Sequence, residues 1–412
     1  MPGTKYIVIL IDGAADCAVD VLGGKTPLQA ARKPAIDALA GQAEIGLVQT
    51  IPEGMPAGSD TANLSIFGYD PRKDYTGRSS LEAASMGVDL ADDDVAFRCN
   101  LVTLSGEGPY PERTMADYSA GEIPTDQSRL LIADLADALG SKDIGFHAGI
   151  SYRHLIVWKG GPTGSRLTPP HDISGRRIGD YLPEGGGKDV LLGLMVRSTQ
   201  ILSRHSVNKS RVAAGLRPAN AIWIWGEGRR PKLVPFSAKY GVEGSVISAV
   251  DLVKGIGVCA GLRIISVPGA TGNIHTNYSG KAGAALEELR SGRDFVYLHI
   301  EAPDECGHQG DVEGKVRSIE IIDSKVVAVV RKGLEDLGGR FRIMILPDHP
   351  TPIIRKTHTS EPVPFLIYDS AKPLPSGLSG YDECIAATTG LRLGQGYKLM
   401  GRFLEKADAR TD

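Results

Sequence analysis

Acidic residues and histidines follow three apolar runs of the chain at the points where these runs end. Asp12 closes the run YIVILI, and the remaining members of the set come after two later runs, at Asp304, His308, Asp348 and His349, with His358 nine residues further on. Carboxylates and imidazoles bind divalent ions, and apart from Cys306 no thiol accompanies them, which favours Mn²⁺, Mg²⁺, Co²⁺ or Zn²⁺. Singly, each residue would suit a turn, a helix cap or a hydrogen-bonded core position. The acid–histidine pairs in APDECGH and PDHPTP favour a metal site.

A candidate nucleophile, Ser59, lies in MPAGSDTANLSIFGYDP, where a helical pattern begins that extends to about Phe67. The start of a helix carries partial positive charge and is a common place for phosphate to bind. Serine is also a favoured N-cap without any catalytic role, so both interpretations of Ser59 stay open on local sequence. The sequence contains no Gly-x-Ser-x-Gly motif, which would have favoured an esterase. The segment GGGKDV lacks the spacing of a phosphate-binding P-loop. Activation of Ser59 would therefore come from metal.

The elements that must position these residues alternate between strand and helix. Apolar, β-branched runs predict buried strands over residues 6–11, 221–225, 262–267, 295–300, 341–346 and 365–368. Helical patterns cover residues 36–43, 245–255, 281–290 and 316–337. Continuous apolar strands separated by helices are typical of an α/β sandwich with a parallel sheet, whose ligands bind beyond the carboxyl ends of the strands.

Residues 92–188 have a different pattern. They open with three aspartates and continue with a strand-like run at 95–104, a helix at 126–139 and a second strand-like run at 152–158, before the glycines at 185–187. We therefore expect a small α+β domain over 92–188, inserted into a discontinuous core made of residues 1–91 and 189–412.

Composition narrows the class of protein. The net charge of −3 gives no reason to expect a nucleic-acid partner. The five cysteines are scattered and never in C-x-x-C spacing, which favours a reducing compartment over a disulfide scaffold or a structural zinc site. No apolar run approaches the roughly 18 residues of a membrane span. The sequence predicts a cytoplasmic protein without a membrane partner and leaves its oligomeric state open.

Five motifs, in order, give the chain a family likeness. ILIDGAAD, AGSDTANLSIFGYDP, PANAIWIWGEG, EAPDECGH and PDHPTP resemble the cofactor-independent, or 2,3-bisphosphoglycerate-independent, phosphoglycerate mutases of the archaeal type, within the alkaline phosphatase superfamily. The likeness extends over nearly the whole chain. It implies an alkaline-phosphatase-like three-layer α/β/α core with an inserted small α+β domain, in agreement with the insertion expected above.

The resemblance also implies roles for individual residues. Ser59 would be the nucleophile that is transiently phosphorylated. One of two metal ions would be bound by Asp12, Ser59, Asp348 and His349, and the other by Asp304, His308 and His358. Lys281 would be a cation that stabilises the transition state, or else a solvated lysine at a helix start. Substrate contacts would come from Arg153, His154, Arg98 and Arg78, each of which also suits an ordinary surface position.

The activity implied is that of an isomerase of glycolysis and gluconeogenesis, which interconverts 2- and 3-phosphoglycerate through a phosphoserine and needs no 2,3-bisphosphoglycerate. The inserted domain would cap the substrate and exclude water. One alternative is a metal-dependent phosphomonoesterase, or a mutase of another small phosphorylated metabolite, because one fold supports both reactions. A second is a non-catalytic regulator on the same fold, against which the intact set of candidate ligands counts. A homoserine kinase is disfavoured because no ATP-binding loop is present.

Overall fold

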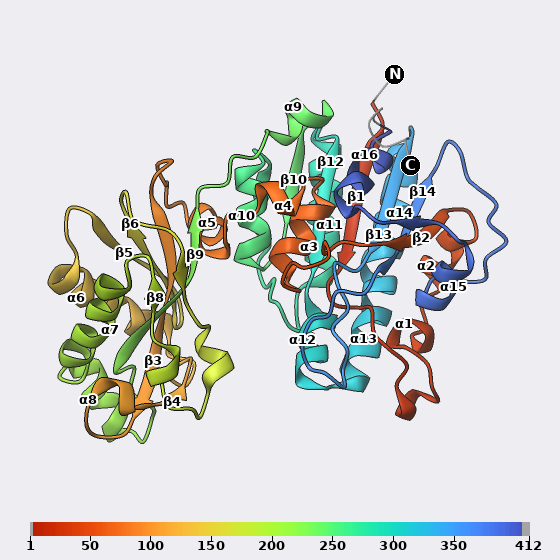
Figure 1. Cartoon of the computed structure of the whole chain (residues 1–412). Helices are drawn as coiled ribbons and strands as arrows, with labels where there is room; N and C mark the ends of the chain where they lie inside the picture. The colour runs from red at the N-terminus through yellow and green to blue at the C-terminus, as the bar shows by residue number, and fades with distance from the viewer. Residues whose placement is uncertain (1–2, 406–412) are drawn as a thin grey trace. The chain divides into compact units, whose positions relative to one another are not determined.

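The computed structural model describes residues 3–405, which form two compact units. Unit 1 consists of the chain up to Tyr75 together with the chain from Lys232 onwards, and unit 2 is Thr76–Pro231. The chain therefore leaves the first unit once and returns to it once (Figure 1).

Unit 1 is built on an eight-stranded sheet with the strand order β11-β10-β12-β1-β13-β14-β2-β15. Its strands are β1 (Lys5–Ile11), β2 (Glu44–Val48), β10 (Gly244–Ile247), β11 (Arg263–Ile265), β12 (Phe295–Ile300), β13 (Phe341–Leu346), β14 (Val363–Asp369) and β15 (Arg392–Leu393). From β11 to β13 neighbouring strands run parallel, whereas β14 is antiparallel to both β13 and β2. The sequence predicted a parallel sheet, and the antiparallel strand β14 departs from that pattern.

Helices cover both faces of this sheet. The helices of unit 1 are α1 (Pro27–Ala30), α2 (Pro34–Ala40), α3 (Ser59–Ile66), α4 (Pro71–Asp74), α9 (Phe236–Tyr240), α10 (Asp251–Cys259), α11 (Tyr278–Arg290), α12 (Ala302–Gln309), α13 (Val312–Ile322), α14 (Ala328–Leu337), α15 (Glu383–Thr388) and α16 (Leu399–Phe403). A π-helical turn, Asp323–Val327, joins α13 to α14, so the long helix predicted at 316–337 is nearly continuous. The three-layer α/β/α arrangement expected for the core is thereby confirmed.

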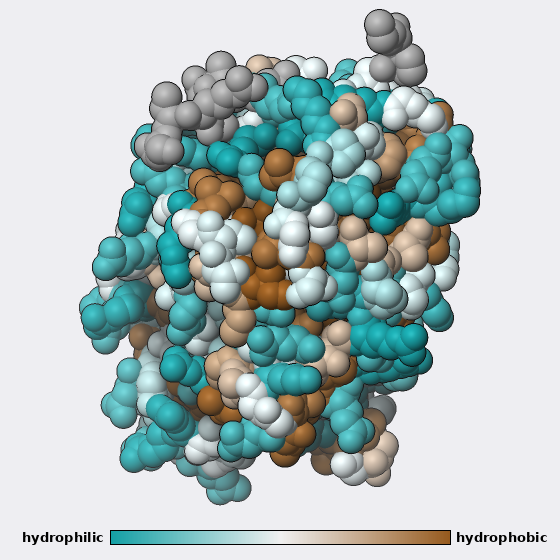
Figure 2. Space-filling model, turned by 90° about the vertical axis from the view of Figure 1, so that its right-hand side faces the viewer, coloured by the Kyte–Doolittle hydropathy of each residue, from teal (hydrophilic) through white to brown (hydrophobic). Residues whose placement is uncertain are grey.

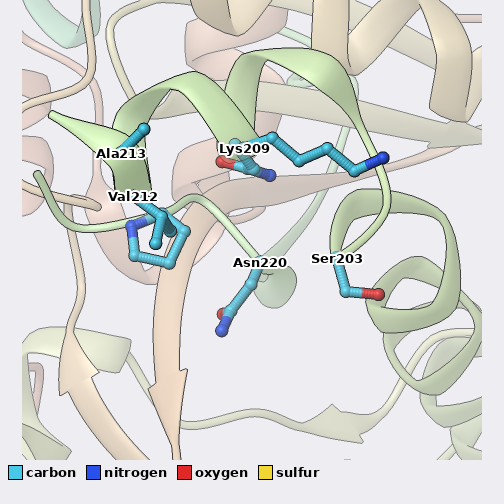
Figure 3. Close-up of a pocket in the computed structure, with 7 residues that line it drawn as sticks. Ser203, Lys209, Val212, Ala213 and Asn220 are labelled. Atoms are coloured by element: carbon cyan, nitrogen blue, oxygen red, sulfur yellow. The ribbon is translucent and has the colours of Figure 1, made fainter.

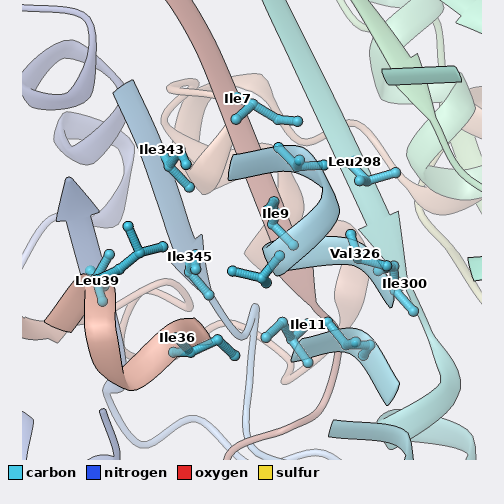
Figure 4. Close-up of a cluster of buried hydrophobic side chains, with 14 of the residues drawn as sticks. Ile7, Ile9, Ile11, Ile36, Leu39, Leu298, Ile300, Val326, Ile343 and Ile345 are labelled. Carbon is cyan, nitrogen blue, oxygen red and sulfur yellow. The ribbon is translucent and has the colours of Figure 1, made fainter. Parts of the chain in front are cut away.

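One face of the sheet forms a large aliphatic core. Every second residue of β1 (Ile7, Ile9 and Ile11) points to this face and packs with residues of β12, β13, α2 and the π-helical turn (Figure 4). On the opposite face, Phe67 at the end of α3 stacks on Tyr297 with ring centroids 4.0 Å apart, and Phe236 of α9 stacks on Phe295 at 4.7 Å. Alternation along β1 and β12 thus assigns each side chain to one helical layer.

Unit 2 is an α+β structure with its own core. It contains α5 (Arg78–Ser85), β3 (Val95–Ser105), β4 (Thr114–Asp117), α6 (Thr125–Leu139), β5 (Ile144–Ile150), β6 (Arg153–Trp158), β7 (Ser165–Arg166), β8 (Glu184–Gly185), α7 (Lys188–Leu202), α8 (Ser206–Ala213) and β9 (Ala221–Arg229). Its main sheet has the order β4-β3-β6-β5, and β9 pairs antiparallel with the long strand β3.

Two sequence-based expectations differ from this arrangement. The run at 221–225 was expected in the parallel sheet of the core, but β9 belongs to unit 2, because its backbone pairs with β3 from Val95 to Val102. For the same reason unit 2 is wider than the expected insertion at 92–188. The helical pattern at 245–255 was wrong at its start, since Gly244–Ile247 is a strand and the helix begins at Asp251.

The surface visible in Figure 2 is a mixture of hydrophilic residues and small hydrophobic patches. Among the described residues, no helix is both long and apolar enough to cross a membrane. None of the five cysteines, all of which lie within residues 3–405, forms a disulfide.

Candidate metal centre and active site

The carboxyl ends of three adjacent parallel strands bring the predicted ligands together. β1 lies between β12 and β13, so Asp12, the helix that carries Asp304, and the Asp348–His349 pair meet at one edge of the sheet. Gly13, with φ of +63°, allows this approach: a Cβ at this position would lie 2.6 Å from the Cα of Asp304. Only glycine combines that backbone conformation with that contact.

Hydrogen bonds fix the carboxylate of Asp348 in this edge. Its Oδ1 accepts from the backbone N–H of Gly13 at 3.1 Å and of His349 at 2.9 Å. Its Oδ2 accepts from Nδ2 of Asn63 at 2.8 Å, and Asn63 in turn accepts the hydroxyl of Tyr297 at 2.7 Å. Asp348 is fully buried. Its orientation is therefore determined by α3, β12 and the turn after β1 together.

Ser59 is the first residue of α3 and lies at this same edge. Its Oγ is 3.0 Å from Nε2 of His349, and its backbone carbonyl accepts from Asn63 at 2.9 Å. Gly58 is the N-cap and makes no side-chain capping contact, so Ser59 is not the capping residue. The hydroxyl is half-buried and directed toward the acid–histidine cluster, as a nucleophile would need to be.

Asp304, His308 and His358 form the second half of the cluster. Nε2 of His308 lies 3.3 Å from one Asp304 oxygen, and Nε2 of His358 lies 3.4 Å from the other. The two histidine Nε2 atoms are 2.9 Å apart. The hydroxyl of Thr351 donates to Asp304 as well. All six residues that the sequence predicted as strand-end ligands are thus in one cluster.

Distances divide the cluster differently from the expectation. Three sets of ligand atoms lie within 4.8 Å of one another: Asp304, His349 and His358; Asp12, His299 and Asp348; and Asp12, Glu301 and Asp304. His349 is grouped with Asp304 and His358, but its Nε2 also lies 3.4 Å from Asp348 and 3.7 Å from Asp12, so it borders both proposed ion sites. His299 appears beside Asp12 and Asp348. The donors are oxygen and imidazole nitrogen, a combination that suits Mn²⁺, Mg²⁺, Co²⁺ or Zn²⁺.

The ionisation of the cluster shows an excess of buried negative charge. Burial raises the pKa of Asp12 well above its ordinary value, and the neighbouring carboxylates of Asp348 and Asp304 raise it further. Burial opposes ionisation of Asp304 too, but hydrogen bonds from His308 and His358 outweigh it and hold its pKa well below the usual range. The hydrogen bond to Asp304 raises the pKa of His308 to about 9. Divalent cations would relieve this repulsion, and the residues present fit such ions.

Three residues of the site were missed from sequence. His299 and Glu301 were treated as parts of an apolar strand and its exit, and Asn63 as part of a helix. His299 is fully buried, and burial lowers its pKa to about 3. The available signal was a histidine in the middle of an otherwise apolar strand, where a polar group needs a partner.

Lys281, the weaker catalytic candidate, is fully buried in α11. This overturns the alternative of a solvated lysine at a helix start. Its Nζ donates to the backbone carbonyl of His299 at 3.1 Å. Burial lowers its pKa to about 8, against the opposing effect of Glu301. The ammonium thus lies beneath the strand that carries His299.

The predicted substrate-binding residues all lie in unit 2. Arg98 is buried and forms an ion pair with Glu82, which also accepts from Nε of Arg78 at 2.9 Å. The guanidinium of Arg98 lies over the ring of Trp225, 5.1 Å from its centroid. Two arginines thus share one carboxylate, and the pKa of Glu82 is lowered because their charges outweigh the effect of burial.

Strand register separates Arg153 from His154. Asn100 pairs with Arg153 and Cys99 with His154, so Arg153 falls on the face of the sheet that carries Arg98. Arg153 is exposed beside Tyr152. His154 faces the other side, where its Nδ1 accepts from the backbone of Gly149 at 3.0 Å. Burial lowers the pKa of His154 to about 3, so this imidazole is neutral.

Unit 2 also has a pocket of about 470 Å³ between α8 and the start of β9 (Figure 3). Its lining combines Lys209 with small and apolar side chains, among them Ser203, Val212, Ala213 and Asn220. The pocket contains one charged group and no acid–base pair. It therefore lacks the functional groups for the chemistry that the strand-end cluster can support.

Comparisons with known proteins give a consistent result. A sequence profile described as 2,3-bisphosphoglycerate-independent phosphoglycerate mutase matches residues 40–208. A probable 2,3-bisphosphoglycerate-independent phosphoglycerate mutase of Geobacter sulfurreducens is 51% identical over 98% of this chain and 100% of its own length. The corresponding protein of Methanosarcina acetivorans is 49% identical over 97% of this chain and all of its own.

Solved structures agree with the sequence comparison. A protein of Pyrococcus horikoshii has a TM-score of 0.81 at 27% identity and covers 99% of both chains. The cofactor-independent phosphoglycerate mutase of Thermoplasma acidophilum has a TM-score of 0.64 at 26% identity, covering 98% of this chain and 99% of its own. The likeness therefore includes both units and not the sheet of unit 1 alone.

Proposed function

Since the chain belongs to the family of 2,3-bisphosphoglycerate-independent phosphoglycerate mutases, we propose that it interconverts 2-phosphoglycerate and 3-phosphoglycerate as an isomerase of glycolysis and gluconeogenesis. The near-complete coverage of relatives at about half identity supports this. The observation that carries the mechanism is the position of the Ser59 hydroxyl, 3.0 Å from His349 within a buried cluster of carboxylates and imidazoles.

Two divalent ions are part of the proposal, one held by Asp12, Ser59, Asp348 and His349 and the other by Asp304, His308 and His358. Burial lowers the pKa of His349 and so favours its neutral imidazole, which is the form that binds metal. When bound, such a pair of ions lowers the pKa of a hydroxyl nucleophile and neutralises the charge of a phosphoryl group. Oδ1 of Asp12 is buried with no hydrogen-bond partner among residues 3–405, and a metal ion at this position would supply one.

Ser59 is the proposed nucleophile. Its Oγ would attack phosphorus, the bond to the glycerate oxygen would break, and the phosphoryl group would then pass from Ser59 to the other hydroxyl of the same glycerate. The start of α3 favours the negative charge that this exchange brings to Ser59. Lys281 would add buried positive charge beside Glu301 and hold the backbone of β12. Two in-line displacements predict overall retention of configuration at phosphorus.

Unit 2 is proposed to bind the glycerate end of the substrate and cap it. Arg98, Arg78 and Arg153 supply guanidinium groups suited to a carboxylate or phosphate. Glu82 shares its charge between two of them, and the Nε of Arg98 has no partner within the described chain, so hydrogen-bonding capacity remains for a ligand. His154 was also expected to contact substrate, but it lies buried on the opposite face of the sheet from Arg98 and Arg153, so it is left out of this proposed ligand contact. We further propose that the enzyme acts in the cytoplasm on this small-molecule substrate, without nucleic acid or membrane as a partner.

The test is an enolase-coupled assay with 3-phosphoglycerate, the full chain, and Mn²⁺, Mg²⁺, Co²⁺ or Zn²⁺ in turn, without 2,3-bisphosphoglycerate. We expect turnover that depends on the metal. Release of inorganic phosphate from phosphoglycerate without isomerisation would instead establish the phosphomonoesterase. Metal binding without activity on either substrate would favour the regulator.

A further inference from the structure

His299 is a buried histidine whose Nε2 has no hydrogen-bond partner within residues 3–405. It lies on β12, where register pairs it with Leu10, two residues before Asp12 on the neighbouring strand. Side chains two residues apart on a strand point to the same face, so His299 and Asp12 are directed to the same layer. Nε2 of His299 is 2.9 Å from Oδ2 of Asp12.

The other ring nitrogen of His299 is positioned to fix its tautomer. Nδ1 lies 3.2 Å from the hydroxyl oxygen of Ser248. That hydroxyl donates to the carbonyl of Val250 at 3.4 Å and accepts from the N–H of the same residue at 2.9 Å. With the hydroxyl proton directed to Val250, Ser248 can accept from Nδ1–H, an arrangement that would leave the lone pair of Nε2 free. Metal-binding histidines commonly donate their second ring N–H to a fixed acceptor in this way.

The surroundings of Nε2 favour a cation. Asp12 Oδ1, like Nε2, is buried without a hydrogen-bond partner among the described residues. Ligand atoms of Asp12, His299 and Asp348 lie within 4.8 Å of one another, and all three residues are buried. A lone pair beside a carboxylate oxygen is repelled by it unless a proton or a positive ion lies between them, and a divalent ion would relieve this repulsion together with that among the neighbouring carboxylates. The backbone of His299 is also held in place, because Lys281 donates to its carbonyl.

We propose that Nε2 of His299 is a further ligand of the divalent ion bound by Asp12 and Asp348. The inference rests on the proposed two-metal function and adds a nitrogen donor from β12 to the ligands assigned there. The ion then has ligands from β12, from the end of β1 and from the end of β13, the three central strands of the sheet.

The experiment compares the full-length wild type with His299→Ala and with a control, His275→Ala, which removes an exposed histidine of the same unit. Ion stoichiometry and affinity are measured by dialysis and calorimetry with Co²⁺, and histidine nitrogens coupled to Mn²⁺ are counted by pulsed electron paramagnetic resonance. We expect His299→Ala to lose one coupled nitrogen and to weaken one of two ions by more than the roughly 10–100-fold typical of an outer-shell partner. His275→Ala should match the wild type.

Ser248→Ala provides a second test if His299→Ala does not fold, since it leaves the imidazole in place. It should retain the nitrogen coupling while weakening the same ion. Two bound ions with unchanged affinities and nitrogen couplings in His299→Ala would overturn the inference alone, and a lowered affinity with unchanged couplings would also overturn it, as an outer-shell effect. A wild type that binds no Co²⁺ or Mn²⁺ would instead overturn the metal-dependent function.

Discussion

Each unit contains a cluster of charged side chains, but the cluster of unit 1 is mainly acidic and that of unit 2 mainly basic. At the strand ends of unit 1, Asp12, Asp304 and Asp348 are buried together, and crowding raises the pKa of Asp12. In unit 2, Arg78 and Arg98 share the single carboxylate of Glu82. The first cluster is thus made of acidic groups buried together, and the second of guanidinium groups around one carboxylate. Clustered buried carboxylates suit cations, and clustered guanidinium groups suit an anionic ligand, which agrees with the roles proposed for the two units.

Removing metal should have the largest effect on this comparison. We expect chelation followed by dialysis to reduce mutase activity by at least about 10³-fold, because the carboxylates of unit 1 would then repel the phosphate dianion. Adding Mn²⁺, Co²⁺ or Mg²⁺ should restore it. The enolase-coupled rate is the measurement, and full activity in excess chelator would rule out the two-metal assignment.

Lys315→Met tests how a buried charge stabilises unit 1 next to the metal residues. Nζ of Lys315 is 2.7 Å from Asp16 with both side chains fully buried, and it donates to the carbonyl of Thr351, whose hydroxyl binds Asp304. Removing one partner of such a pair should lower the free energy of unfolding by about 3–5 kcal/mol. Denaturant unfolding of the metal-free chain measures it.

The matched control is Lys332→Met on α14, whose ion pair with Asp336 is exposed to solvent. That substitution should leave the free energy of unfolding nearly unchanged, because solvent screens the pair. Equal losses in Lys315→Met and Lys332→Met would show that burial of the pair does not determine its contribution.

Arg153→Ala tests the anion-binding role of unit 2. If Arg153 binds the glycerate carboxylate, mutase kcat/KM should fall about 10–100-fold, consistent with loss of one charge-assisted hydrogen-bonding group. Hydrolysis of an aryl phosphate, which has no carboxylate, should change much less. Arg129→Ala, at an exposed position on α6, is the control and should leave both rates unchanged. Equal losses on both substrates would assign Arg153 to phosphate binding or to structure.

A smaller effect is expected in the pH dependence of metal binding. In the metal-free chain the pKa of His308 is about 9, raised by Asp304, so the ring is protonated at neutral pH. Binding requires the neutral ring, so affinity should fall as pH decreases below about 9, and roughly one proton should be released per ion at pH 7.5. Calorimetry in buffers of different ionisation enthalpy measures that proton. His308→Gln should bind the ion more weakly and without this proton release.

The sequence predicted the strand-end cluster well because its signal is local. Asp12, Asp304 and Asp348 each follow a contiguous apolar run, and parallel strands deliver their carboxyl ends to one edge. What it missed depends on pairing between distant segments. β9 has the composition of a core strand, and only its hydrogen bonds with β3 assign it to unit 2. His299 was not identified because it lies within an apolar strand and its neighbour Asp12 is 287 positions away in the sequence. The burial of Lys281 could not be predicted from a helical pattern alone.

The central claim, that Ser59 of unit 1 carries the phosphoryl group between the two hydroxyls of the substrate, is tested most directly by trapping that group. The wild-type chain is mixed with phosphate-labelled 3-phosphoglycerate and Mn²⁺, quenched in acid and digested, and the labelled peptide is identified by mass spectrometry. We predict acid-stable label on the peptide that contains Ser59, and neither label nor mutase activity in a folded Ser59→Ala variant. Acid-labile label on a histidine, or mutase activity retained by Ser59→Ala, would contradict the account.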